Sequence, residues 1–441
     1  MIQTQKIRKF FPSIESGRTV SNNAASTQIP IQLLDLLKEL TVQYDNVHRG
    51  QSRASQLTTE RFEASYDTIA QFIGAPSRKN IILYRNTTEA INSVMYSLMT
   101  EFKDGDNVIT TFMEHNSNYV PWYGLATEIL PKFGVNIEYR LVKFDKETGE
   151  LDLEHLKSLV DEKTKLICCS GASNFLGTKN PIKKIREIAN KSGYIQPNGE
   201  KRSYLLIDGA QTVPNIFIDV KELDIDFLAW SFHKIIAPFG VGGLYAKEEL
   251  LNTMRPFLYG GDMIADGKVS PEKVEYNVLP WKFTAGTPNI LGTILSAEAI
   301  RLLIDFSLNP GEYKYFKTEK KLERSDIEEA MKNIEDHEKT LIGKAIEMLQ
   351  EIPSIKIYGP KDPAGRTSLV AFTCENKSPF EIAEELSKLS VESRAGCHCA
   401  TLAHHYFELN PPASCRLSFY IYNDLKDVEK ACLAVKKICS N

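Results

Sequence analysis

One lysine of the sequence stands directly after an apolar segment. The apolar residues 227–230 lead through a Ser-x-His turn to Lys234, and a glycine-rich turn then opens a second apolar segment. A lysine in this setting lies at the rim of a buried sheet, where its amine could form a Schiff base. Upstream, the apolar residues 204–207 end in Asp208, an acid that could meet a pyridinium nitrogen if the two strand ends are neighbours. The two segments together suggest pyridoxal 5'-phosphate (PLP) as the cofactor.

Other polar clusters also follow strand-like segments. Thr87 and Thr88 stand between the apolar residues 81–84 and a segment with helical spacing, where free N–H groups and the helix dipole make a good anion cradle. A plain threonine N-cap explains this segment equally well. His115 and Asn174 each follow a further apolar segment, although a lone histidine is more often structural. Because open α/β sheets bind ligands at the carboxyl ends of their strands, we expect these clusters to meet at one edge.

A cysteine-containing loop has three competing interpretations. Arg394, Gly396, Cys397, His398 and Cys399 come close together, with two more histidines shortly after. A metal site is the weaker interpretation, because C-x-C spacing does not match the usual cysteine pairs of zinc sites. Packing as a small hydrophobic residue suits the cysteines in apolar segments better than it suits Cys399. Positive charge from Arg394 and His398 would favour a reactive thiolate at Cys399.

Composition limits the classes of function. The chain has 441 residues, 42% of them hydrophobic and 25% charged, which is typical of a globular protein with a large core. Its net charge of −4 gives no broad basic surface, so we expect a small, anionic ligand and no nucleic-acid partner. No apolar run approaches the roughly 18 residues of a membrane span, and the N-terminus has no signal-peptide pattern. We therefore expect a cytoplasmic protein with no membrane partner and with reduced thiols.

Helical and extended patterns alternate along the chain, which favours an α/β fold with two domains. We expect a large cofactor-binding domain over 21–287. A smaller α+β domain would contain 1–20 and 288–441, with the boundary near Pro288. The highly charged stretch 307–332 is expected to be a solvated surface insertion, followed by a helix from Glu335.

Seven motifs occur in the order found in one family, and the chain resembles the class V aminotransferase-fold PLP enzymes. Within that group it is most similar to the group II (Suf-type) cysteine desulfurases and selenocysteine lyases. The resemblance implies PLP-dependent transferase fold type I, with a mainly parallel seven-stranded sheet in the large domain. The motifs are Asn23-Ala24-Ala25, Thr87-Thr88-Glu89, Glu114-His115, Asp208-Gly209-Ala210-Gln211, Ser231-x-His233-Lys234, Ala285-Gly286-Thr287-Pro288-Asn289 and Arg394-x-Gly396-x-x-Cys399-Ala400.

The resemblance also implies a role for each site residue. Lys234 would be the Schiff-base lysine and proton carrier, Asp208 would pair with the pyridine nitrogen, and His115 would stack on the ring. The other cofactor contacts implied are Thr87, Thr88, Asn174, Gln211, Ser231 and His233, together with Thr287 reaching the partner subunit's cofactor in a homodimer. The implied substrate contacts are Asn174, Arg394 and Arg416, since a planar guanidinium suits a carboxylate. No metal is implied.

The implied reaction is that of a cysteine desulfurase. L-Cysteine would become L-alanine, and Cys399 as thiolate would take the sulfur as a persulfide. A sulfur-acceptor protein and a place in iron–sulfur cluster assembly belong to the same expectation. Without Cys399 the same residues could still catalyse elimination, racemisation or transamination.

Departures from the family pattern leave alternatives open. Asn22 and Asn86 stand where the family usually has Asp and Gly, while Ser52 and Cys397 stand at or near positions where it usually has His. With Arg53 and Cys397 in or near the pocket, the substrate could be selenocysteine, a cysteine conjugate or a cysteine sulfoxide, and Cys397 could instead resolve a persulfide. A lyase or aminotransferase acting on another amino acid would make Cys399 incidental. A sulfur carrier or metal-binding scaffold would use Cys397, His398, Cys399, His404 and His405 without PLP.

Overall fold

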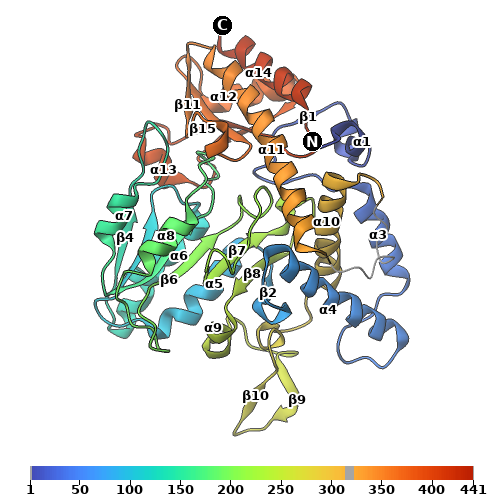
Figure 1. The fold of residues 1–441 in the computed structure, drawn as a ribbon, viewed down its shortest axis with the longest axis vertical. Coiled ribbons are helices and arrows are strands. Elements are labelled where there is room, and N and C mark those ends of the chain that lie inside the picture. Colours follow the sequence, from blue (N-terminus) through green and yellow to red (C-terminus); the bar gives the residue numbers. More distant parts are fainter. Residues whose placement is uncertain (1, 313–321, 441) are drawn as a thin grey trace.

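The computed structural model describes residues 2–312 and 322–440 (Figure 1). Its large sheet has seven strands in the order β2-β8-β7-β6-β5-β3-β4. The five strands from β7 to β4 are parallel, and β8 runs antiparallel to both of its neighbours. The expected mainly parallel seven-stranded sheet is therefore confirmed. The strands are β2 (Ile81–Tyr84), β3 (Asn107–Thr111), β4 (Glu138–Val142), β5 (Thr164–Ser170), β6 (Tyr204–Asp208), β7 (Phe227–Ser231) and β8 (Gly242–Ala246).

The central strands are apolar because both faces of the sheet are covered. Along β6, Leu205 and Ile207 belong to one hydrophobic core, while Tyr204 and Leu206 belong to another. Successive side chains of a strand point to opposite faces, so a strand covered on both sides appears as one continuous apolar run. One face packs on α5 (Thr87–Leu98), α6 (Val120–Gly124) and α9 (Glu248–Thr253); the other packs on α3 (Ile31–Val42), α4 (Arg53–Ile73), α8 (Ile182–Ala189) and α10 (Ile290–Leu308).

A second sheet of four antiparallel strands lies above the first in Figure 1. Its strands in order are β11 (Ile355–Tyr358), β12 (Leu369–Cys374), β15 (Ser414–Ser418) and β14 (Arg394–Gly396). Three helices pack on it around a separate core: α11 (Arg324–Gln350), α12 (Pro379–Lys388) and α14 (Leu425–Cys439). The N-terminal strand β1 (Thr19–Val20) pairs with β13 (Val391–Glu392), so the chain start joins this part of the molecule.

The charged stretch 307–332 differs from the expected insertion. Ser307 still belongs to α10, and α11 begins at Arg324, well before the expected start at Glu335. Ile327, Ala330, Met331 and Ile334 are buried at helical spacing among the charged residues, so an amphipathic helix accounts for the composition from Arg324 onward. Residues 313–321 lie outside the described residues. The predicted division into two domains at Pro288 stays a prediction. Helix α10 follows Pro288 in the sequence and yet packs on α3 and α4, which precede that boundary.

The remaining α-helices and strands are short. They are α1 (Thr4–Arg8), α2 (Pro12–Glu15), α7 (Leu153–Leu159), α13 (Thr401–Tyr406) and the hairpin of β9 (Ile264–Val269) and β10 (Val274–Tyr276), which projects at the bottom of Figure 1. Over residues 2–312 and 322–440, no helix combines the length and apolarity needed to cross a membrane.

Candidate active site

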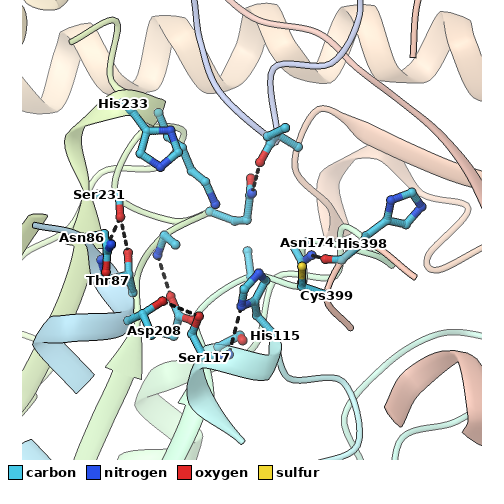
Figure 2. Close-up of a pocket in the computed structure, with 18 of the residues that line it drawn as sticks. Asn86, Thr87, His115, Ser117, Asn174, Asp208, Ser231, His233, His398 and Cys399 are labelled. Atoms are coloured by element: carbon cyan, nitrogen blue, oxygen red, sulfur yellow. Dashed lines mark hydrogen bonds between the residues drawn. The ribbon is translucent and has the colours of Figure 1, made fainter. Parts of the chain in front are cut away.

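A cavity of about 250 Å³ opens at the carboxyl ends of the parallel strands, between the two sheets (Figure 2). Every side chain predicted for the site lines this cavity except Thr287. The cavity therefore brings together Thr87, Thr88, His115, Asn174, Asp208, Gln211, Ser231, His233, Lys234, Arg394, Cys399 and Arg416. Thr287 lies instead on a second cavity of about 470 Å³, beside Tyr84 and Arg85. Arg53 and Cys397 line neither cavity.

Lys234 and Asp208 approach the cavity from adjacent strands. Asp208 ends β6 and accepts a hydrogen bond from the Ala210 N–H at 2.9 Å, and Lys234 ends the short turn that follows β7. Burial lowers the pKa of Lys234 to about 8, an effect that Asp208 partly opposes. Burial also raises the pKa of Asp208 above its usual range. With a pKa of about 8, about a tenth of the lysine amine is neutral and nucleophilic at pH 7, far more than for an ordinary lysine.

Donors for an anion gather where α5 begins. The Ser231 hydroxyl oxygen accepts from the Thr87 N–H at 2.8 Å and lies 2.6 Å from the Thr87 hydroxyl, while the Thr88 and Ser117 hydroxyls are 2.7 Å apart. Asn86 caps the helix, since its Oδ1 accepts from the Glu89 N–H at 2.9 Å. A helix N-terminus lined with hydroxyls is a suitable phosphate site.

One edge of the Arg416 guanidinium has no hydrogen-bond partner in the described residues. The side chain is 1% exposed, and its Nη1 donates to the Asn174 carbonyl at 2.6 Å, whereas Nε and Nη2 are buried without a partner in the described residues. Nε and Nη2 form the edge of the guanidinium that binds a carboxylate with two parallel hydrogen bonds. Arg394 lies opposite Arg416 in the β14–β15 pair. Burial lowers the pKa of Arg416 to about 9, and Arg394 adds to this effect, so an anion is needed to balance the two cations.

His115 is a neutral imidazole. Burial lowers its pKa to about 3, with smaller contributions from Lys234, Arg416 and Arg394. Its Nδ1 accepts from the Ser117 N–H at 3.0 Å, so the ring proton is on Nε2. Behind it, Glu114 accepts from the Ser170 N–H at 3.0 Å and from the Asn118 amide at 2.7 Å, which fixes the loop after β3.

Cys399 reaches the same cavity from the loop between β14 and α13. The carbonyl of Cys399 accepts from the Asn116 N–H at 2.6 Å, and the carbonyl of His398 accepts from Asn174 Nδ2 at 2.7 Å (Figure 2). Cys399 also lines an adjoining apolar cavity of about 480 Å³ with Met95 and Tyr96. Cys399 thus lies between the cavity of Lys234 and an apolar space.

The histidines of this loop have other partners than a metal. The ring nitrogens of His398 and His404 both contact the hydroxyl of Ser414. Among the described residues, no cluster of three or more His, Cys, Asp or Glu side chains has the arrangement of a metal site.

Sequence analysis missed Ser117 and Ser170, which also line the cavity. Ser170 ends β5 and Ser117 lies in the turn that follows β3, as the predicted residues end or follow strands, so the same signal could have identified them. Sequence analysis also placed Ser52 and Arg53 near the pocket. Ser52 instead caps α4, accepting from the Ser55 N–H at 3.1 Å and donating to Asp45 at 2.8 Å.

The cavity suits PLP. The buried polar atoms of its lining residues that have no partner in the described residues are Asn174 Oδ1, His233 Nδ1, His398 Nδ1, and Nε and Nη2 of Arg416. Buried polar groups are normally hydrogen-bonded, so these atoms indicate bound polar molecules. The hydroxyls at the start of α5 suit a phosphate, Lys234 suits an aldehyde, and Asp208 suits a ring nitrogen.

Comparison with known proteins supports the same interpretation. Residues 20–325 and 327–431 match the model of the aminotransferase class-V family. A cysteine desulfurase of Haloferax volcanii is 36% identical over 412 residues, covering 93% of this chain and 86% of that protein. A cysteine desulfurase of Escherichia coli O7:K1 is 33% identical over 440 residues, covering 98% and 97% of the two chains.

Solved structures agree in fold. The apo structure of cysteine desulfurase from Thermococcus onnurineus has a TM-score of 0.86 at 29% identity and covers 100% of this chain and 98% of that chain. The cysteine desulfurase CsdA (S-sulfonic acid) from Escherichia coli has a TM-score of 0.81 at 27% identity and covers 99% and 98%. The resemblance predicted from the seven motifs is thus confirmed, and the chain belongs to the class V aminotransferase family.

Proposed function

We propose that the protein is a PLP-dependent cysteine desulfurase, which converts L-cysteine to L-alanine and takes the sulfur onto Cys399. The observation that carries the proposal is that Lys234, Cys399 and Arg416 all line one cavity, and that Nε and Nη2 of Arg416 have no partner in the described residues. The relatives described above, which are named cysteine desulfurases and align along nearly the whole chain, support it.

PLP would be held by Lys234 through its aldehyde, by Asp208 through its ring nitrogen, and by Thr87, Thr88, Ser231 and His233 through its phosphate. Gln211, whose Nε2 donates to the Ala24 carbonyl at 2.7 Å, would face the phenolic oxygen, and the neutral ring of His115 would stack on the cofactor. When bound, PLP withdraws electrons from the substrate Cα and so weakens the bonds to the α-proton and to the β-sulfur.

The protein's own residues would perform the remaining tasks. Arg416 would bind the substrate carboxylate through Nε and Nη2, with Asn174 and Arg394 beside it. The neutral amine of Lys234 would take the Cα proton and return a proton when alanine forms. The thiolate of Cys399 would attack the substrate sulfur; the S–S bond forms as the Cβ–S bond breaks, and the bonding electrons stay with carbon.

A homodimer would complete the site. Thr287 lies away from the cavity of its own chain and would reach the cofactor of a partner subunit. A cytoplasmic location, a sulfur-acceptor protein and a place in iron–sulfur cluster assembly belong to the same proposal.

Incubation of the purified protein with L-cysteine and a reductant tests the activity. Alanine and sulfide in equal amounts support a desulfurase, whereas pyruvate with ammonia would indicate a lyase. Selenocysteine, cysteine conjugates and cysteine sulfoxides, assayed in parallel, define the substrate. Loss of the cofactor absorbance in Lys234→Ala would exclude a scaffold that functions without PLP, while a colourless wild-type protein with bound zinc would favour one.

A further inference from the structure

Cys399 lies on strained backbone. His398 has a φ of 52° and Cys399 a φ of 57°, so two successive non-glycine residues are left-handed. Side chains of L-residues disfavour this region, and such a conformation persists only where the surrounding structure holds it. Some contact must therefore fix the loop that carries the thiol.

One hydroxyl joins the two sides of this loop. The Ser414 Oγ lies 3.0 Å from the His398 Nε2 and 3.0 Å from the His404 Nε2, and the His404 Nδ1 lies 3.0 Å from the Ala400 carbonyl. His398, His404 and Ser414 are all buried, and the His404 ring stacks on Phe175 with centroids 3.9 Å apart. We call Ser414, His398 and His404 the serine bridge. Figure 2 shows the His398 ring pointing away from Asp208 and His233.

The proton positions in the serine bridge follow from its partners. A carbonyl only accepts, so the His404 Nδ1 carries a proton that it donates to Ala400. Burial lowers the pKa of His404 to about 4, and the neutral ring has a lone pair on Nε2. The Ser414 hydroxyl then donates to His404 and accepts from the His398 Nε2–H. Each hydrogen bond of the chain thus has one donor and one acceptor, and it ties the residues on both sides of Cys399 to β15.

The same strand holds the carboxylate-binding group. Ser414 and Arg416 are two residues apart on β15, so their side chains lie on one face of the sheet. Asn174 connects Arg416 to the loop of Cys399. Its carbonyl accepts from the Arg416 Nη1 at 2.6 Å, and its amide donates to the His398 carbonyl at 2.7 Å. One strand therefore sets the spacing between the Arg416 edge and the Cys399 loop.

We propose that Ser414, acting through His398 and His404, is the positioning residue that holds the Cys399 thiol at the sulfur of a substrate bound to Arg416. The inference rests on the proposed desulfurase function and adds to it the group that fixes the nucleophile. Ser414 itself touches neither the substrate nor the cofactor.

Ser414→Ala removes the bridging hydroxyl. Its matched control is Cys415→Ala, which also removes one heavy atom from a buried side chain, on the neighbouring residue and in the core behind β15. Ser414→Thr keeps a hydroxyl and serves as the rescue. A second pair tests His404. His404→Asn places its amide where Nδ1 was and loses the contact to Ser414, whereas His404→Gln places its amide where Nε2 was and keeps it.

Two measurements on the PLP-loaded protein test the proposal. The first is the rate of Cys399 alkylation by iodoacetamide, followed by mass spectrometry with fragment ions that separate Cys399 from Cys397. It should be at least threefold faster in Ser414→Ala and His404→Asn than in Cys415→Ala, Ser414→Thr and His404→Gln, because the loop is no longer held. The second is alanine formation, for which kcat should fall at least tenfold in the same two variants while KM for L-cysteine stays within twofold.

Equal alkylation rates in Ser414→Ala and Cys415→Ala would overturn the proposal, as would faster alkylation with unchanged alanine formation. If Ser414→Ala does not fold, the His404→Asn and His404→Gln pair decides by the same criteria. If wild-type protein makes no alanine from L-cysteine, the proposed function fails, and alkylation still reports whether the serine bridge holds the loop.

Discussion

Arg416→Lys is the sharpest test of the substrate site. The substitution keeps a positive charge but replaces the planar edge of Nε and Nη2 with a single ammonium, so at most one of the two expected hydrogen bonds to the substrate carboxylate survives. A hydrogen bond to a charged group contributes about 1.5–3 kcal/mol. At about 1.4 kcal/mol per tenfold change, kcat/KM for L-cysteine should fall about 10- to 150-fold.

The assay compares L-cysteine with cysteamine, which has the same amine and thiol but no carboxylate. We expect Arg416→Lys to lower kcat/KM for L-cysteine and to leave any turnover of cysteamine unchanged within about twofold. Arg366→Lys is the matched control, since Arg366 is also buried but donates to the backbone carbonyls of Pro360, Tyr358 and Leu369. That control should affect both substrates alike. Equal losses with the two substrates in Arg416→Lys, or no loss with L-cysteine, would refute the carboxylate role.

Three other predictions concern Lys234, Cys399 and Asn86. Because burial lowers the pKa of Lys234 to about 8, the fraction of neutral amine increases as pH rises. Capture of PLP by the apoprotein, followed by absorbance, should therefore accelerate from about pH 6 through about pH 8 and level off only above about pH 9; a rate independent of pH would contradict this. Cys399→Ala should abolish sulfide and alanine formation yet keep the spectral change on L-cysteine addition, and undiminished alanine would show that Cys399 is incidental. Asn86→Ala, which removes the cap of α5, should lower the free energy of unfolding by about 1 kcal/mol in urea titrations, and Asn86→Gly by only a few tenths; equal losses would argue against the cap.

The sequence predicted the site residues that lie at the carboxyl ends of strands. Lys234, Asp208 and Thr87 each follow an apolar run that is typical of a buried strand, and parallel strands present their carboxyl ends at one edge. Their convergence on one cavity therefore followed from local patterns, and their order matched a known family. The expected helix start at Glu335 was wrong, since α11 begins at Arg324, because an amphipathic helix with a narrow apolar stripe resembles a solvated segment in composition.

The sequence by itself determined the fold class, the family and most cavity-lining residues, since these depend on hydrophobic periodicity and on motifs of a few neighbouring residues. Only the tertiary structure decided which atoms of those residues are free. The edge of Arg416, the cap role of Ser52 and the bridge from Ser414 to His398 and His404 arise from contacts across strands and loops. Antiparallel register and side-chain rotamers set such contacts, and neither leaves a periodic signal in the chain.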